Sequence, residues 1–402
     1  MADTVKPILI SAVDLAVQVI QASNEARLFK KEWDVVKIKM LVRLERSIIN
    51  VSWLLNVSTP SHDGKHEQLT GLLPFAIRDP TIFLIYELMA ILYTGTLDDD
   101  ACEAARSLRS MASDNPRCAE IMIRNGLCSV FVKILKQGSM RVQAEVACAT
   151  SVLVSSFSES QDLFAQHDVI QLLLSLLTSK LEEDSWHMKA MAAKALRELA
   201  KGNSSISKSI TDSKRFLRFA DLLEIQDREV RLISLMVLIE ITSVAEMDSS
   251  LRRHSAFKCK SPVFKAIVNQ FHKLIEENGD MVLLIPYITL IGNLARSFRA
   301  SDTSMIEQLV KLLGLRDREV LREAIVALTK FAIPCNYLHI DHSRAIVEAG
   351  AAKRLIELSS LGCEIRIPVA SEVLICIAVH VPEKNKSWKY WNVHRSNHLS
   401  KS

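Results

Sequence analysis

One phrase occurs twice in this chain, in LLEIQDREVRLISLMVLIEIT at residues 222–242 and in LLGLRDREVLREAIVALTKFA at residues 312–332. In both copies, Asp-Arg-Glu-Val follows a leucine-rich run and precedes an apolar run. An Asp side chain can accept hydrogen bonds from the free N–H groups that begin a helix, and a Glu two residues later suits the positive first turn. The phrase therefore predicts a helix start at Asp227 and again at Asp317.

The two copies align at an offset of 90 residues, and their apolar or small positions then coincide at offsets of 0, 4, 7, 8 and 11. That spacing places one stripe along a helix. The aligned pairs are Val230 with Val320, Ser234 with Ala324, Val237 with Ala327, Leu238 with Leu328, and Ile241 with Phe331. The recurrence indicates an internal repeat.

Similar helix patterns recur at intervals of 38 to 52 residues, so the offset of 90 covers two short periods. They begin near Ala101, Val142, Met188, Val230, Val282, Val320 and Ile365. Repeats of two or three helices with periods of about 40–47 residues are typical of the HEAT and armadillo class. Between these helices lie a shorter one and a second apolar one, as in PRCAEIMIRNG followed by LCSVFVKILKQG at residues 116–138.

This order of short, middle and long helix is the armadillo arrangement, and Gly126 is a suitable stop for the short helix. We expect an all-α fold, a right-handed armadillo-repeat superhelix preceded by a short N-terminal helical region. In the repeat with the longest step, Ser261 is expected to cap the middle helix and Pro262 to occupy its first position. Pro286 is expected either to kink the following helix or to move its start later.

Four regions are predicted along the chain. Residues 1–57 form an N-terminal helical region, residues 58–80 a linker, residues 81–380 a solenoid of about seven repeats, and residues 381–402 a disordered tail. The tail contains KNKSWKYW, whose basic and aromatic residues would suit an anionic membrane interface, although a disordered chain end is the commoner explanation.

Composition excludes several classes of protein. With 402 residues, 49% of them apolar, and only 11 Gly and 10 Pro, the chain can bury a large helical core. Net charge is +4, too small an excess to suggest nucleic acid as the main partner. The eight Cys include no CxxC, which favours reduced thiols packed as small core residues. We expect a cytoplasmic monomer without a transmembrane segment, and leave peripheral attachment at the plasma membrane and a nuclear location open.

Several phrases are more specific than the repeat pattern. NVSWLLNVS (residues 50–58), LLPFAIRDPTIFLIYELMAILYTGTLDDDACEAARSL (72–108), LCSVFVKILKQGSMRVQAEVACA (127–149) and QDLFAQHDVIQLLLSLL (161–177) resemble the plant "armadillo repeat only" family. The opening KPILISAVDLAVQVIQASNEARLFKKE (6–32) is similar to that family's N-terminal helical domain. Compared with that family, the N-terminal helical domain of this chain is shortened and its C-terminal tail is divergent.

The resemblance implies a non-enzymatic scaffold in plant polarised cell growth, whose partners are Rho-type small GTPases and their regulators. A second hypothesis is a nuclear adaptor or transcription co-regulator of the β-catenin type. A ubiquitin ligase would need a U-box before the repeats, and none is recognisable. The sequence contains no GxGxxG, GxxxxGK[ST], GxSxG or HExxH motif, so nothing indicates catalysis or a cofactor.

The third helix of each repeat is expected to line a concave groove. In armadillo adaptors for nuclear import this helix presents a Trp and, four residues later, an Asn. Here the positions equivalent to Asn hold only one Asn, Asn293, and the positions four residues earlier hold no Trp. Import of basic signals is therefore not expected.

What remains is a groove of mixed charge that suits a folded partner with charges of its own. Solvation of an exposed helix face is the commoner explanation for each charge taken singly. The candidate partner groove consists of Arg106, Ser110, Lys194, Arg197, Glu198, Glu240, Asn293 and Lys330.

Two other features have simpler explanations. The segment HIDHS at residues 339–343 could suggest a metal pair, but without a third ligand nearby we expect a loop with two exposed histidines. The acidic run Asp98–Asp100 precedes a helix pattern, so capping and dipole matching explain it.

Overall fold

The computed structural model describes residues 80–94, 97–157, 159–177, 185–277, 279–359 and 369–378. The chain divides into two compact units, Met1–Val169 and Ile170–Ser402. The described residues form helices and their connecting turns and include no strand, which confirms the all-α fold class. The expected N-terminal region, nearly all of the expected linker, and the expected tail lie outside the described residues.

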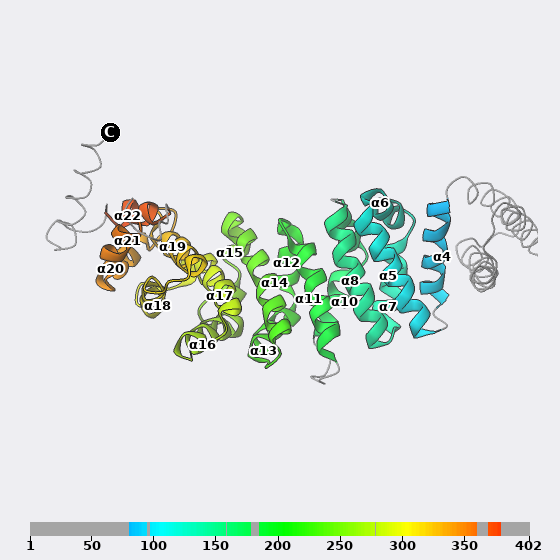
Figure 1. Cartoon of the computed structure of the whole chain (residues 1–402), viewed down its shortest axis with the longest axis horizontal. Helices are drawn as coiled ribbons and strands as arrows, with labels where there is room; N and C mark the ends of the chain where they lie inside the picture. The colour runs from blue at the N-terminus through cyan, green and yellow to red at the C-terminus, as the bar shows by residue number, and fades with distance from the viewer. Residues whose placement is uncertain are drawn as a thin grey trace, which may run out of the picture. The chain divides into compact units, whose positions relative to one another are not determined.

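The first unit shows the predicted order of short, middle and long helix (Figure 1). Its third helices α5 and α8 lie side by side, and α7 packs against both α4 and α8. The bounds are α4 (Pro80–Thr94), α5 (Asp98–Asp114), α6 (Pro116–Arg124), α7 (Leu127–Gln137), α8 (Met140–Ser156) and α9 (Ser160–Gln166). The boundary between the units falls at the first residue of α10 (Val169–Leu177).

The second unit repeats the same order. After α10 come α11 (Trp186–Ala200), α12 (Ser204–Asp212), η2 (Lys214–Leu217), α13 (Arg218–Glu224) and α14 (Arg228–Met247). The next repeat contains α15 (Ser249–Arg252), η3 (Ser255–Phe257), α16 (Pro262–Glu276) and α17 (Met281–Asn293). Two further repeats contain η4 (Ala295–Ser297), α18 (Ser304–Leu312) and α19 (Arg318–Ala332), then α20 (His339–Glu348), α21 (Ala351–Ser359) and α22 (Ala370–Ala378). The third helices α14, α17 and α19 pack in succession.

The repeated phrase begins helices as predicted. The Asp227 carboxylate accepts a hydrogen bond from the backbone N–H of Val230 (2.8 Å), at the start of α14. The Asp317 carboxylate accepts from Glu319 (2.9 Å) and Val320 (3.0 Å), at the start of α19. Both caps satisfy N–H groups that have no partner within the helix.

The aligned stripe is buried in both copies. Each of its members is at most 2% exposed: Val230, Ser234, Val237, Leu238, Ile241, Val320, Ala324, Ala327, Leu328 and Phe331. Burying these side chains supplies the main favourable free energy of the repeat, since each large apolar side chain removed from water contributes about 1.5–3 kcal/mol. A helix of this kind needs a neighbour on its apolar side, which explains why the repeats stack.

Other helix boundaries agree with the sequence only in part. Gly126 ends the short helix region with φ +90°, a left-handed conformation that glycine adopts without strain. Ser261 does lie at the N-cap position of α16 with Pro262 after it, but its hydroxyl makes no capping bond and is buried without a partner among the described residues. The expectation of a Ser261 side-chain cap is therefore wrong.

Pro286 does not move the start of its helix. The helix α17 begins at Met281, where Asp280 caps it by accepting from the Val282 N–H (2.9 Å), and Pro286 lies inside it. Proline has no N–H to donate to the carbonyl four residues earlier, so the helix loses one internal bond at this point. Burial of the surrounding apolar residues, such as Leu284 and Ile288, contributes favourable free energy that opposes this loss.

Candidate functional site: the third-helix surfaces

The third-helix surface of each unit is the set of side chains that its third helices present outside the core. In the first unit these helices are α5 and α8, and in the second they are α11, α14, α17, α19 and α22. The candidate groove residues lie on these helices in both units. Arg106 and Ser110 belong to the first unit, and the other six belong to the second.

In the first unit, Glu145 of α8 holds two arginines of α5. Arg106 Nε donates to Glu145 Oε1 at 2.8 Å, and Arg109 Nη1 donates to Glu145 Oε2 at 3.2 Å. The hydrogen bond to Glu145 raises the pKa of the Arg106 guanidinium above its ordinary value. Ser110 is exposed, and its hydroxyl lies 3.4 Å from Asp114 Oδ2 on the same helix. Arg106 is thus paired across two helices, whereas Ser110 bonds locally.

In the second unit, a first ionic contact joins α11 to α14. Arg197 Nε lies 3.5 Å from Glu240 Oε1, and the Arg197 guanidinium lies 3.9 Å from Glu198. All three side chains are half-buried, so the solvent screens their charges less than it screens a fully exposed pair. Lys194, one turn earlier on α11, is exposed and has no ion pair among the described residues.

A second cluster joins three consecutive third helices. Asn293 of α17 donates from Nδ2 to Thr242 Oγ1 of α14 at 3.0 Å. Lys330 of α19 donates to Asn293 Oδ1 and also to Glu246 Oε2 of α14, the latter at 2.8 Å. One lysine therefore reaches across α17 to a carboxylate 84 residues earlier in the chain.

Close approach of α17 and α19 makes this reach possible. A Cβ atom on Gly292 would lie 3.0 Å from Ala327 Cα and 3.1 Å from Ala327 Cβ, tighter than ordinary van der Waals contact. A side chain at this position would require the two helices to move apart by a few tenths of an ångström, so glycine favours the close contact. The Lys330 stem passes beside the same position, with its Cδ 3.5 Å from that hypothetical Cβ.

A further ion pair links the ends of two third helices. Arg228, in the first turn of α14, donates to both carboxylate oxygens of Asp280, with Nη2 at 3.2 Å from Oδ1. The hydrogen bond from Arg228 holds the pKa of the Asp280 carboxyl below its ordinary value. Asp280 also caps α17, so the same carboxylate fixes the start of one helix against the start of its neighbour.

In the structure, several of the predicted groove residues connect neighbouring third helices, a role that the sequence did not indicate. Arg197 and Glu240 come together, as do Asn293 and Lys330, while Lys194 stands apart from both groups. The only Asn at a ladder position already uses both ends of its amide within the protein. The sequence did not predict their partners Glu145, Thr242 and Glu246. The one indication was that each is a polar residue within a largely apolar helix pattern.

The HIDHS segment is a helix start rather than a loop. His339 is the first residue of α20, and His342 is 1% exposed, so the expectation of a loop with two exposed histidines is wrong. The His342 ring packs against Phe331, with ring centroids 5.1 Å apart, and its Nδ1 lies 3.2 Å from Asn336 Nδ2. Among the described residues no group of three or more His, Cys, Asp or Glu side chains could hold a metal ion.

Cysteines are mostly core residues where the structure describes them. Cys102, Cys118, Cys128 and Cys148 are buried, Cys259 and Cys376 are half-buried, and Cys335 is exposed. Burial raises the pKa of the Cys128 thiol to about 12, which keeps it protonated and unreactive at neutral pH. No helix in the described residues is long and apolar enough to cross a membrane.

Comparison with known proteins supports the fold. No protein-family model matches the chain, and no curated protein matches it. Among solved structures, an engineered protein is similar with 24% identity and a TM-score of 0.61, over 84% of this chain and 81% of that one. A designed armadillo repeat protein in complex with the peptide (KR)4 has 20% identity and a TM-score of 0.42, over 72% and 98%. Computationally designed armadillo repeat proteins for modular peptide recognition have 18% identity and a TM-score of 0.42, over 73% and 99%.

The similarity to the engineered protein supports the fold alone. The two designed armadillo repeat proteins are too dissimilar in structure to support any further conclusion. Together with the repeated order of short, middle and long helix, the fold defines the class of protein. It is an all-α solenoid of the armadillo-repeat kind.

Proposed function

We propose that this chain is a non-enzymatic protein-binding scaffold whose third-helix surface in the second unit holds a folded partner. The observation that carries the proposal is the polar bonding between the third helices. Lys330, Asn293 and Glu246 hold one another across three helices, and Arg197 meets Glu240 across two. Because these contacts fix half-buried charged groups in place, the surface is preorganised for a partner with complementary charges.

An extended peptide clamped by an asparagine ladder is a poorer fit. Such a clamp needs free Asn amides, whereas the Asn293 amide already bonds to Thr242 and Lys330. A folded protein can instead meet the exposed Lys194 and the outer edges of the paired charges.

We extend the proposal to the partner on the strength of the sequence phrases at residues 72–108 and 127–149. Their resemblance to the plant "armadillo repeat only" family supports a Rho-type small GTPase, or a regulator of one, in polarised cell growth. This extension places the scaffold in the cytoplasm or at the inner face of the plasma membrane.

A pull-down tests the partner. The full chain is immobilised and exposed to a Rho-type GTPase loaded with a GTP analogue or with GDP, and to the regulators of that GTPase. We expect retention of the GTP-analogue form or of a regulator. If neither is retained by protein that circular dichroism shows to be folded, the assignment of the partner is wrong. Strict nuclear accumulation of a fluorescently tagged chain would favour the co-regulator hypothesis instead.

A pair of variants tests the surface independently of the partner. Lys194→Glu reverses the exposed, unpaired charge on α11, and Lys353→Glu reverses an exposed charge on α21, which is a middle helix. We expect Lys194→Glu to weaken partner binding about tenfold, and Lys353→Glu to leave it unchanged. Equal binding by both variants would rule out the third-helix surface near Lys194 even if the partner is correct.

A further inference from the structure

A strongly basic segment of the second unit lies outside the third helices in the sequence. Between residues 249 and 275 the sequence contains six Lys or Arg and no Asp or Glu. The whole chain carries a net charge of only +4, so this segment alone exceeds the excess of the entire protein. A local excess of positive charge this large attracts negatively charged partners, because it creates a local potential that the net charge of the chain does not reveal.

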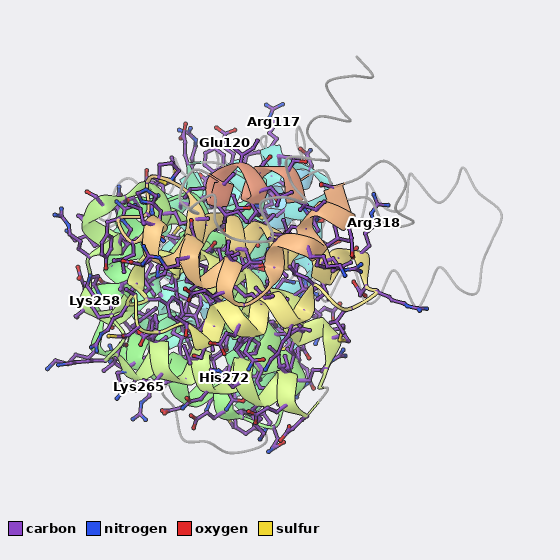
Figure 2. The ribbon with its side chains drawn as sticks, turned by 90° about the vertical axis from the view of Figure 1, so that its left-hand side faces the viewer. Arg117, Glu120, Lys258, Lys265, His272 and Arg318 are labelled. Carbon is purple, nitrogen blue, oxygen red and sulfur yellow. The ribbon has the colours of Figure 1, made fainter. Side chains whose placement is uncertain are left out.

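The first and second helices of two successive repeats bring more cations to the same surface. The aromatic rings of Phe216 in η2 and Phe257 in η3 meet with centroids 6.1 Å apart, and α13 packs against α16. His254 Nε2 lies 3.2 Å from Asp212 Oδ1 and joins the α15–η3 turn to the end of α12. These contacts place Lys214 and Arg215 beside the basic segment. In Figure 2, Lys258 and Lys265 lie at the same edge of the molecule with their side chains directed outward.

We define the basic face as six exposed cations on these elements. They are Lys208, Lys214, Arg215, Lys258, Lys260 and Lys265. None of the six forms an ion pair with another described residue; the neighbouring Arg218, by contrast, pairs with Asp221 at 2.9 Å. The third-helix surface differs in kind, since Arg106, Arg197 and Lys330 each have a carboxylate partner there. Like charges that remain uncompensated on one surface repel one another until an anionic partner neutralises them.

Three features favour an acidic polypeptide over a nucleic acid or a lipid surface. The phenylalanine rings of these elements are all buried, so none is available to stack on bases or to anchor at a lipid headgroup layer. Leu217 is the one large apolar side chain exposed within the described part of these elements, at 46%.

A polar cleft beside the face supplies the third feature. It has a volume of about 440 Å³ and is lined by Gln171, Ser205, Lys208, Ser209, Asp212 and Ser213. The hydroxyls and the amide offer both donors and acceptors, which a peptide main chain can use, whereas phosphates only accept. Asp212 in the wall of the cleft would repel any anionic group, so the neutral main chain of a peptide suits the cleft better than its acidic side chains do.

We propose that the basic face binds an acidic, extended segment of a partner protein, with Glu or Asp side chains on Lys258, Lys260 and Lys265 and the main chain entering the cleft beside Lys208. This would be a second protein-binding surface, formed by first and second helices, and it does not depend on the function proposed for the third helices. Because long-range attraction supplies most of the binding, the affinity is strongly salt-dependent.

The test uses the full chain and a dye-labelled peptide of alternating Glu and Ser, with binding followed by fluorescence anisotropy. The face variant is Lys258→Glu/Lys260→Glu/Lys265→Glu. Its matched control is Arg316→Glu/Arg318→Glu/Lys353→Glu, which makes the same change in net charge at exposed positions elsewhere in the second unit. We expect the face variant to lose about tenfold or more in affinity, and the control to stay within about twofold of the original chain. The milder Lys258→Gln/Lys260→Gln/Lys265→Gln variant should give an intermediate loss and guards against misfolding of the charge reversal.

Other anions identify the class of partner. A peptide of alternating Gln and Ser should not bind, and a single-stranded DNA oligonucleotide and vesicles of phosphatidylcholine with phosphatidylserine should bind more weakly than the acidic peptide. Equal affinity of the face variant and its control would overturn the proposal. So would tighter binding of the oligonucleotide or the vesicles, if the face variant removes that binding.

Discussion

At the scale of single residues, Lys330 is the side chain on which the candidate site depends most. It bonds to Asn293 and Glu246, on two other helices, and its side chain is 25% exposed. A lysine held this way is partly shielded from water, so its ion pair should contribute more to stability than a pair on the open surface. The Arg141–Asp99 pair of the first unit offers the comparison, with side chains that are 67% and 83% exposed.

We predict a measurable coupling between Lys330 and Glu246. A double-mutant cycle with Lys330→Met and Glu246→Gln, measured by urea unfolding, should give about 0.5–1 kcal/mol. The same cycle with Arg141→Met and Asp99→Asn should give close to zero, because that pair is open to solvent. Coupling energies of equal size in the two cycles would contradict the view that burial and fixed geometry distinguish the Lys330 cluster.

His342 provides a pH-dependent prediction at the same scale. Burial lowers the pKa of its imidazole below the ordinary 6.5. The nearby backbone groups of Phe331 and Arg299, and then the carboxylates of Asp341 and Asp302, offset this only in part. Below pH 6.5 the unfolded chain therefore binds the proton more readily than the folded chain does, and stability is lost as the pH falls toward the lowered value. Above that window the His342 contribution is constant.

The measurement is the urea midpoint between about pH 7.5 and pH 5. We expect His342→Gln to flatten part of the decline in stability at the acidic end, even if the variant is less stable overall. His167→Gln removes an exposed imidazole and serves as the control, with an unchanged profile. If the His342 and His167 variants have the same slope, the buried imidazole does not control acid stability.

At the scale of elements, the contact between α17 and α19 determines whether the cluster can form. Gly292 permits an approach in which an added Cβ would lie 3.0 Å from the Ala327 backbone. Gly292→Val should force the two helices apart and destabilise the second unit by about 1–3 kcal/mol, as overpacking does elsewhere. Thermal unfolding followed by circular dichroism measures this loss.

A glycine outside the helices provides the comparison for crowding. Gly314→Val changes a glycine after α18, where an added Cβ has only one neighbour within 4 Å, the Lys311 carbonyl oxygen at 3.2 Å. We expect a smaller loss there. If Gly292→Val is tolerated as well as Gly314→Val, the close approach of α17 and α19 does not limit the stability of this unit.

Elements also show what the sequence could and could not predict. The caps at Asp227 and Asp317 were predictable because a cap is a bond between residues two or three apart in the chain. The bond from Lys330 to Glu246 was not, since it links positions 84 residues apart and depends on how closely three helices approach. His342 was misjudged for a related reason, because its burial comes from packing against Phe331 and not from its neighbours in the sequence.

At the scale of the whole molecule, charge is distributed in two ways. Both units pair charges between third helices, as Arg106 does with Glu145 and Lys330 with Glu246. The charges of the basic face in the second unit have no ion-pair partner in the part of the chain that the structure describes. Charges that are already paired respond less to salt than exposed charges without a partner do. The two proposed binding surfaces should therefore differ in how salt affects them.

We predict that the two surfaces act independently. Lys194→Glu should weaken binding of the folded partner and leave the affinity for the acidic peptide unchanged. Lys258→Glu/Lys260→Glu/Lys265→Glu should weaken binding of the acidic peptide and leave the affinity for the folded partner unchanged. We expect this because changes at separate sites without shared partners combine additively. Anisotropy of the labelled peptide, measured with and without saturating folded partner, gives the coupling directly. An affinity for the peptide that changes less than about twofold when the partner is bound would show that both can occupy one chain. Competition between them would contradict independent action of the two surfaces.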